Sequence, residues 1–146
     1  MIATDGTPLV RAQEAVGTLA DVKAAEVVDE FIARIGRMDL DGACELVADD
    51  VEYDNVPMGK SHGPQGIKDI LGPMVGAIDA LEFVVHRQVA DGNLVLNERT
   101  DRFVKGDLTI DLPVAGVFEV TDGRISLWRD YFDMAEVNRM MTEFAS

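Results

Sequence analysis

The sequence predicts an α+β fold, in which three to four helices pack on a curved, mixed and mostly antiparallel sheet. Helical periodicity dominates the first half of the chain, and strand-like runs separated by tight turns fill most of the second half. A curved sheet covered by helices makes a cone with an internal pocket. The length of 146 residues and the hydrophobic content of 47% suit one domain with its own core, so we interpret residues 1–146 as a single domain.

The first half of the chain contains the predicted helices. Residues 1–18 have no clear periodicity, and we interpret them as a loosely packed lead-in. Thr18-Leu19-Ala20-Asp21 then resembles a capping box, after which apolar residues recur at helical spacing. We expect a short helix over residues 41–47 and a strand over residues 51–56. Gly63-Pro64 begins a third helix, whose apolar face comprises Ile67, Ile70, Leu71, Met74, Val75 and Ile78.

The second half contains four predicted strands and a last helix. The strands are expected over residues 81–89, 94–104, 108–120 and 125–132. The segments between them are turns, namely Asp91-Gly92-Asn93, Lys105-Gly106-Asp107 and Thr121-Asp122-Gly123. Connections this short join antiparallel neighbours, so the four strands form a meander. The last helix is expected over residues 134–144.

The composition argues against several classes of function. The formal net charge of −14 repels phosphate backbones and anionic membranes, so we expect neither a nucleic-acid nor a membrane partner. No apolar stretch is long enough to span a bilayer, and the first residues lack the pattern of a secretory signal, so we expect a cytoplasmic protein. A lone Cys44 and two distant histidines, His62 and His86, predict no metal site. The chain has no phosphate loop and no dinucleotide fingerprint.

Charged residues on the predicted strands are the first candidates for chemistry. Arg99 and Asp101 are two residues apart, so their side chains point to the same face of a strand, and Asn97 joins them. One interpretation is a solvated outer face that carries an ion pair; the other is a functional site. On the last strand, Asp130 lies between Trp128 and Phe132 on one face. A carboxylate among aromatic side chains needs a partner, and Arg99 is a candidate, either in a site or in a structural ion pair.

An early strand carries a second pair of polar side chains. Tyr53 and Asn55 alternate, so the phenol and the amide share one face. Together they suit the binding of a water molecule, because both can donate and accept hydrogen bonds. The alternative is a sheet tyrosine next to a turn asparagine.

Three motifs together resemble those of limonene-1,2-epoxide hydrolases. They are Tyr53-Asp54-Asn55, Glu98-Arg99-Thr100-Asp101 and the segment from Trp128 to Asp133. Their order and separations also fit, as does Gly116-Val117-Phe118 before the last turn. The resemblance covers about residues 20–140.

The resemblance implies a cone-shaped α+β barrel of the nuclear transport factor 2-like (NTF2-like) and ketosteroid isomerase type, a homodimer and no cofactor. It implies that Asp130 is the general base, that Asp101 is the general acid and that Arg99 bridges them. Tyr53 and Asn55 become ligands of the attacking water. The substrate implied is a small hydrophobic epoxide, and the implied pocket residues are Met74, Ile78, Phe103, Leu112, Val114, Trp128 and Phe132.

This mechanism requires Asp101 to be protonated while Asp130 is ionised. Burial raises the pKa of a carboxyl group and an adjacent arginine lowers it, so the sequence leaves the direction open. Arginine suits the position between two carboxyls because it stays charged and donates to both sides.

Two other functions remain open at this point. An isomerase of the same fold would use a carboxylate base and a tyrosine or a protonated aspartic acid to stabilise an enolate. Arg99 argues against it, because that chemistry needs no cation between the acids. A non-catalytic carrier of small molecules is the second alternative, since one fold hosts many functions.

Overall fold

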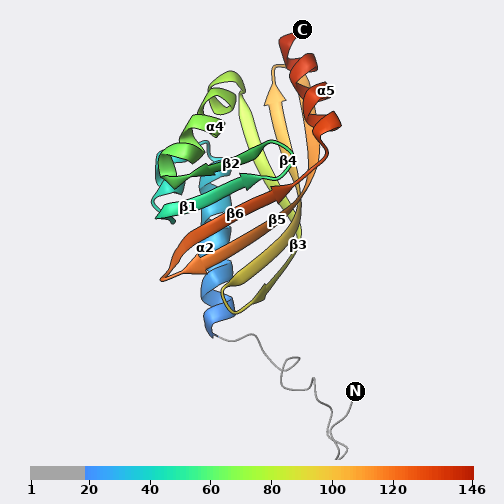
Figure 1. The fold of residues 1–146 in the computed structure, drawn as a ribbon. Helices are drawn as coiled ribbons and strands as arrows, with labels where there is room; N and C mark the ends of the chain where they lie inside the picture. Colours follow the sequence, from blue (N-terminus) through green and yellow to red (C-terminus); the bar gives the residue numbers. More distant parts are fainter. Residues whose placement is uncertain (1–18) are drawn as a thin grey trace, which may run out of the picture.

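The computed structural model describes residues 19–146, and within them four helices and six strands form an α+β fold around one curved sheet (Figure 1). This agrees with the predicted class. The helices are α2 (Leu19–Gly36), α3 (Leu40–Cys44), α4 (Gly63–Ala77) and α5 (Met134–Ala145). The predicted lead-in and Thr18 of the predicted capping box lie outside the described residues.

The sheet is mixed and mostly antiparallel, as predicted, with strand order β2-β1-β6-β5-β4-β3. Its second half is the predicted meander, because β3, β4, β5 and β6 pair in succession and antiparallel. β1 joins this meander by parallel pairing with β6, and β2 pairs antiparallel with β1. The strands are β1 (Val47–Asn55), β2 (Gly59–His62), β3 (Ala80–Asp91), β4 (Leu94–Lys105), β5 (Leu108–Thr121) and β6 (Arg124–Tyr131).

Two elements at the start of the sheet differ from the sequence-based expectation. The second helix ends at Cys44, and β1 begins at Val47 instead of residue 51. The exposed Asp49 and Asp50 interrupt the apolar alternation and conceal the beginning of this strand. β2 was not predicted, since four residues with mostly exposed side chains carry no hydrophobic pattern; pairing with β1 defines the strand.

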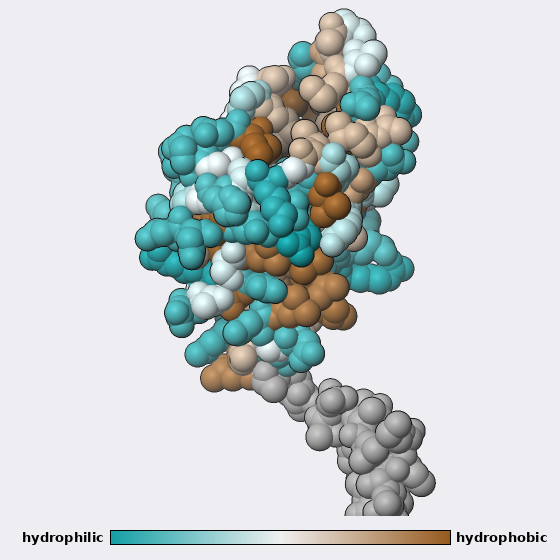
Figure 2. All heavy atoms as spheres, in the orientation of Figure 1, coloured by the Kyte–Doolittle hydropathy of each residue, from teal (hydrophilic) through white to brown (hydrophobic). Residues whose placement is uncertain are grey.

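The inner face of the sheet carries the core. Phe31 of α2 meets Phe118 and Trp128 edge to face, with ring centroids 6.4 and 5.0 Å away. α2 thereby covers one part of this face, while α4 and α5 flank the rest (Figure 1). Figure 2 shows hydrophobic side chains between α4 and α5, where a cavity opens to solvent. No helix within residues 19–146 is long and apolar enough to cross a membrane.

Candidate active site

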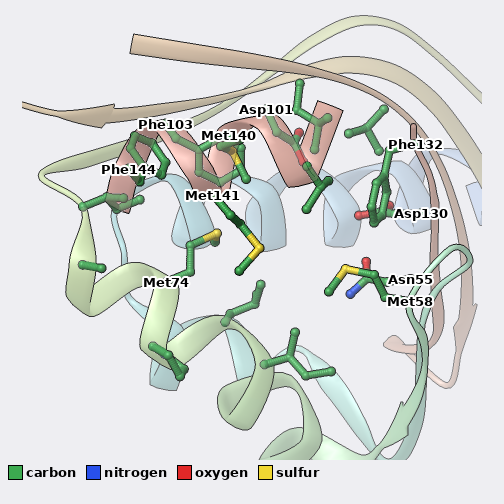
Figure 3. Close-up of a pocket in the computed structure, with 18 of the residues that line it drawn as sticks. Asn55, Met58, Met74, Asp101, Phe103, Asp130, Phe132, Met140, Met141 and Phe144 are labelled. Atoms are coloured by element: carbon green, nitrogen blue, oxygen red, sulfur yellow. The ribbon is translucent and has the colours of Figure 1, made fainter. Parts of the chain in front are cut away.

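A cavity of about 500 Å³ lies between the inner face of the sheet and the helices α4 and α5. Its wall is mostly apolar. Polar side chains gather at one end, where Asp101, Asp130 and Asn55 lie, while Phe103 and Phe144 lie toward the opposite end (Figure 3). An apolar cavity with a few convergent polar groups is the usual form of a small-molecule site.

Arg99 bridges two carboxylates at the polar end. Its Nε donates to Asp101 Oδ1 at 2.7 Å, and its Nη2 donates to Asp101 Oδ2 at 3.2 Å and to Asp130 Oδ2 at 2.5 Å. All three residues are buried, with exposed fractions of 1% for Arg99, 5% for Asp101 and 4% for Asp130. The interpretation of Arg99 and Asp101 as a solvated outer ion pair is therefore wrong.

The pairing of the strands explains how residues far apart in sequence meet here. Asn55 of β1 is paired with Asp130 of β6, which is paired with Gly116 of β5. Gly116 is in turn paired with Asn97 of β4. Arg99 lies two residues further along β4, on the same face as Asn97. The absence of a side chain at Gly116 leaves the space in which the guanidinium crosses from β4 to β6.

The two carboxyls have different surroundings. Burial raises the pKa of Asp101 to about 6, although the Arg99 charge acts in the opposite direction. Asp130 accepts a hydrogen bond on each oxygen, one from Arg99 and one from the Trp128 indole at 2.9 Å. Because an indole N–H and a guanidinium only donate, both oxygens of Asp130 act as acceptors. The pKa of Arg99 is raised, since the attraction of the two carboxylates outweighs the effect of burial.

Tyr53 and Asn55 line the same cavity as these acids, and they share one face of β1 as the alternation predicted. The Tyr53 ring stacks on Trp128, with centroids 4.2 Å apart and an angle of 14° between the planes. Burial, and then the neighbouring Asp130 charge, raise the pKa of the Tyr53 phenol well above its usual range, so the phenol keeps its proton as a donor. Asn55 is buried and lines the cavity next to Asp130.

All seven predicted pocket residues line the cavity: Met74, Ile78, Phe103, Leu112, Val114, Trp128 and Phe132. The sequence analysis missed other parts of the wall. From α5 come Val137, Met140, Met141 and Phe144, whose spacing of i, i+3, i+4 and i+7 was a readable sign of an apolar helix face. Phe83 of β3 also lines the cavity and lies 4.7 Å from the Arg99 Cζ, a contact that only the register between β3 and β4 reveals.

The arrangement can move protons at two points on a neutral molecule. One carboxyl with a raised pKa can deliver a proton, and a second carboxyl with acceptor oxygens can take one. Within residues 19–146, no group of three or more His, Cys, Asp or Glu side chains is arranged to hold a metal ion. His62 and His86 do not line the cavity.

Comparison with known proteins identifies the family. Residues 22–143 match the model of the limonene-1,2-epoxide hydrolase catalytic domain. The epoxide hydrolase EphG of Mycobacterium tuberculosis is 40% identical over 110 residues, which are 75% of this chain and 73% of that protein.

Solved structures agree with this match. A limonene-1,2-epoxide hydrolase-like epoxide hydrolase from M. tuberculosis superposes with a TM-score of 0.73 at 36% identity, covering 86% of this chain and 93% of that chain. An NTF2-like protein of unknown function from Burkholderia pseudomallei has a TM-score of 0.72 at 21% identity, covering 82% and 98%, and shows the fold alone. These matches favour a hydrolase over an isomerase or a carrier. The chain belongs to the limonene-1,2-epoxide hydrolase family and is an epoxide hydrolase with an NTF2-like fold.

Proposed function

We propose that this enzyme adds water to a neutral epoxide with a cyclic or terpenoid skeleton and releases a vicinal diol, in one step without a covalent intermediate. The observation that carries the proposal is the pair of buried carboxyls, Asp101 and Asp130, joined by one arginine at the end of an apolar cavity. An epoxide needs a nucleophile at carbon and a proton for the departing oxygen. One carboxyl can activate water as the nucleophile, and the other can supply the proton.

In this mechanism Asp130 is the general base. It takes a proton from a water molecule that Tyr53 and Asn55 orient, and the water oxygen forms a bond to an epoxide carbon. The bond between that carbon and the epoxide oxygen breaks, and Asp101 gives its proton to the departing oxygen. After this step Asp130 is protonated and Asp101 is ionised. One proton must therefore pass from Asp130 back to Asp101 before the next turnover. Each proton transfer typically contributes about 10²–10⁴-fold in rate.

Arg99 suits this exchange because it tolerates either distribution of the single proton. A guanidinium stays charged and holds both carboxyls in fixed positions through its planar fork. The raised pKa of Asp101 supports its role as the acid, since burial lets this carboxyl keep its proton to a higher pH than an exposed aspartate does.

The cavity supports the proposed class of substrate. Its wall is apolar apart from the acid end and Lys105, which suits a hydrophobic skeleton. Met58, Met74, Met140 and Met141 contribute flexible, polarisable side chains that adapt to ring systems of different shape.

A single turnover in oxygen-18 water tests the proposal, with enzyme in excess over limonene-1,2-epoxide or cyclohexene oxide. Direct attack by water places heavy oxygen in the diol on the first turnover and none in the protein. Attack by Asp130 would place ordinary carboxylate oxygen in the first diol and heavy oxygen in the protein. Label in the peptide that carries Asp130 would make this residue a nucleophile and overturn the proposal. Absence of diol from a panel of cyclic epoxides would refute the substrate class.

A further inference from the structure

One row of paired residues crosses the sheet beneath the Arg99 guanidinium. From β1 to β3 the row reads Asn55, Asp130, Gly116, Asn97 and Gln88. Every member except Gly116 has a polar or charged side chain.

Gly116 lies where the guanidinium passes. A Cβ atom at this position would lie 2.4 Å from Arg99 Nη1, 2.7 Å from Asn97 Oδ1 and 3.2 Å from Asp130 Oδ1. Gly116 has no positive φ, so backbone conformation does not call for glycine here. The space that a side chain would fill is the space that the arginine bridge occupies.

Asn97 holds the third nitrogen of the guanidinium. Its Oδ1 accepts from Arg99 Nη1 at 3.3 Å, and its Nδ2 donates to Gln88 Oε1 at 3.2 Å. Gln88 in turn donates to Asp29 of α2 at 2.9 Å. This chain of bonds fixes the direction of the Asn97 amide, so that its oxygen faces Arg99. Nε and Nη2 then remain directed at the two carboxyls.

We propose that Gly116 and Asn97 are positioning residues for the reaction. Gly116 leaves the space, called the slot below, that the Arg99 guanidinium occupies, and Asn97 fixes the rotation of the guanidinium in that space. The inference rests on the proposed acid–base mechanism, in which Arg99 bridges the acid and the base. Neither residue lines the substrate cavity, so both act through Arg99.

The Gly116→Ala variant adds one methyl group to the slot. Arg99 has little freedom to move aside, because the Phe83 ring lies 4.7 Å from its Cζ and its three nitrogens are already bonded. We therefore expect the added methyl group to strain or break the bonds between the guanidinium and the carboxyls. A displacement of about 1 Å in a catalytic array costs on the order of 100-fold in rate, so we expect kcat to fall by about that factor while KM changes little. The matched control is Gly76→Ala on α4, where an added Cβ meets nothing within 4 Å.

Variants of Asn97 provide a readout that a purely structural role would not move. Asn97→Leu removes the acceptor for Nη1, and kcat should fall about tenfold. Asn97→Asp keeps the acceptor and adds a negative charge on the other side of the Arg99 guanidinium that bonds to Asp101. The titratable or charged groups of residues 19–146 that face Asp101 are Arg99, Asp130 and Tyr53, while its neighbours on β3 and β5 are Phe83 and Leu112. An added carboxylate disfavours ionisation of Asp101, so the alkaline limb of kcat/KM should move to higher pH.

The experiment measures kcat, KM and the pH profile of the five proteins with limonene-1,2-epoxide, together with the melting temperature of each. The expected result is a fall of kcat in Gly116→Ala, no change in Gly76→Ala and an alkaline limb that moves only in Asn97→Asp. Wild-type kcat in Gly116→Ala, or an unmoved limb in Asn97→Asp, would overturn the inference. Lack of turnover by the wild-type enzyme would instead count against the proposed function. In that event, NMR titration of the Asp101 carboxyl in wild type and in Asn97→Asp still tests the inference without turnover. An unchanged pKa of Asp101 would contradict it.

Discussion

At the scale of single residues, the proposed chemistry depends on three buried charged side chains. Arg99, Asp101 and Asp130 are each at least 95% buried, and the arginine bonds to both acids. Charges are costly to bury, and removal of one partner leaves the others uncompensated, at about 3–5 kcal/mol. Well-packed apolar residues of similar volume would often stabilise the fold as much as this bridge or more. The proposed reaction is a reason for charged groups to occupy this place.

The two acids should both be indispensable. We expect Asp101→Asn and Asp130→Asn each to abolish diol formation, because one proton must be given and another taken in the same step. The amide keeps the size of the side chain, so circular dichroism should show an intact fold. Initial rates with a cyclic epoxide provide the test, and activity within tenfold of wild type in either variant would refute the assigned role.

The planar fork of Arg99 should be as important as its charge. Arg99→Lys keeps a positive charge, but an ammonium on a flexible stem cannot donate in parallel to Asp101 and reach Asp130 at the same time. We therefore expect turnover to be lost in this variant. Near-normal kcat would remove Arg99 from the mechanism.

The raised pKa of Asp101 predicts a pH dependence of stability. Burial raises this pKa to about 6, so between pH 4 and pH 6 the folded protein binds more protons than the unfolded chain does. The contribution is fully present below the ordinary pKa of an aspartate and is lost as pH rises through the folded value. We expect the free energy of unfolding to fall by on the order of 2–3 kcal/mol from pH 4 to pH 7 through this group.

Chemical denaturation at several pH values measures this effect. The control is Asp101→Asn, which has no titrating group at this position and should lose that part of the slope. The same slope in both proteins would show that Asp101 does not titrate as described.

At the scale of elements, the period of a strand determines which residues reach the cavity. Along β4, buried positions alternate with more exposed ones, and the buried set runs through Asn97, Arg99, Asp101 and Phe103. One strand therefore supplies the proposed positioning amide, the arginine that bridges the two carboxyls, the proposed acid and part of the apolar wall. A slip of one residue in register would turn all four side chains to the outer face.

Helix α5 completes the cavity from the other side and depends on its first turn. The Asp133 side chain accepts from the Ala135 backbone N–H at 2.8 Å and caps the helix. We expect Asp133→Ala to lower the free energy of unfolding by about 1 kcal/mol, because this bond and the carboxylate at the helix N-terminus are lost. Thermal denaturation measures the effect, and amide hydrogen exchange should quicken mainly in α5.

Glu143→Gln is the matched control for the cap, since it removes an acidic charge from an exposed position on the same helix. It should leave stability within about 0.5 kcal/mol of wild type. Equal effects of the two substitutions would show that the cap contributes nothing specific.

At the scale of the whole molecule, we expect two copies of the chain to associate. The resemblance to the family implies a homodimer, and large side chains such as Val89 and Leu96 remain exposed on neighbouring strands, at 65% and 40%. Burial of these apolar side chains against a second copy of the chain would remove them from water and so favour association. Multi-angle light scattering at micromolar concentration should give twice the chain mass of 15.9 kDa. A monomer mass across that range would contradict the prediction.

The sequence by itself determined the α+β class, the order of the predicted helices and strands, and which candidate residues share a face. These properties are local, because side-chain period and turn residues act over a few positions. Arg99 with Asp101, Tyr53 with Asn55, and Asp130 between aromatic residues could all be predicted in this way. The motifs they form also indicated the family.

Only the tertiary structure decided how these pairs meet. The parallel pairing of β1 with β6 brings Asn55 to Asp130 across a long stretch of chain, and no local turn specifies such a contact. The registers of β5 with β6 and of β4 with β5 place Gly116 between Asp130 and Asn97, which makes a space where the sequence shows only a glycine in a strand. Burial of the charges and the pKa of Asp101 follow from this packing, because desolvation depends on the neighbours that the whole fold assembles.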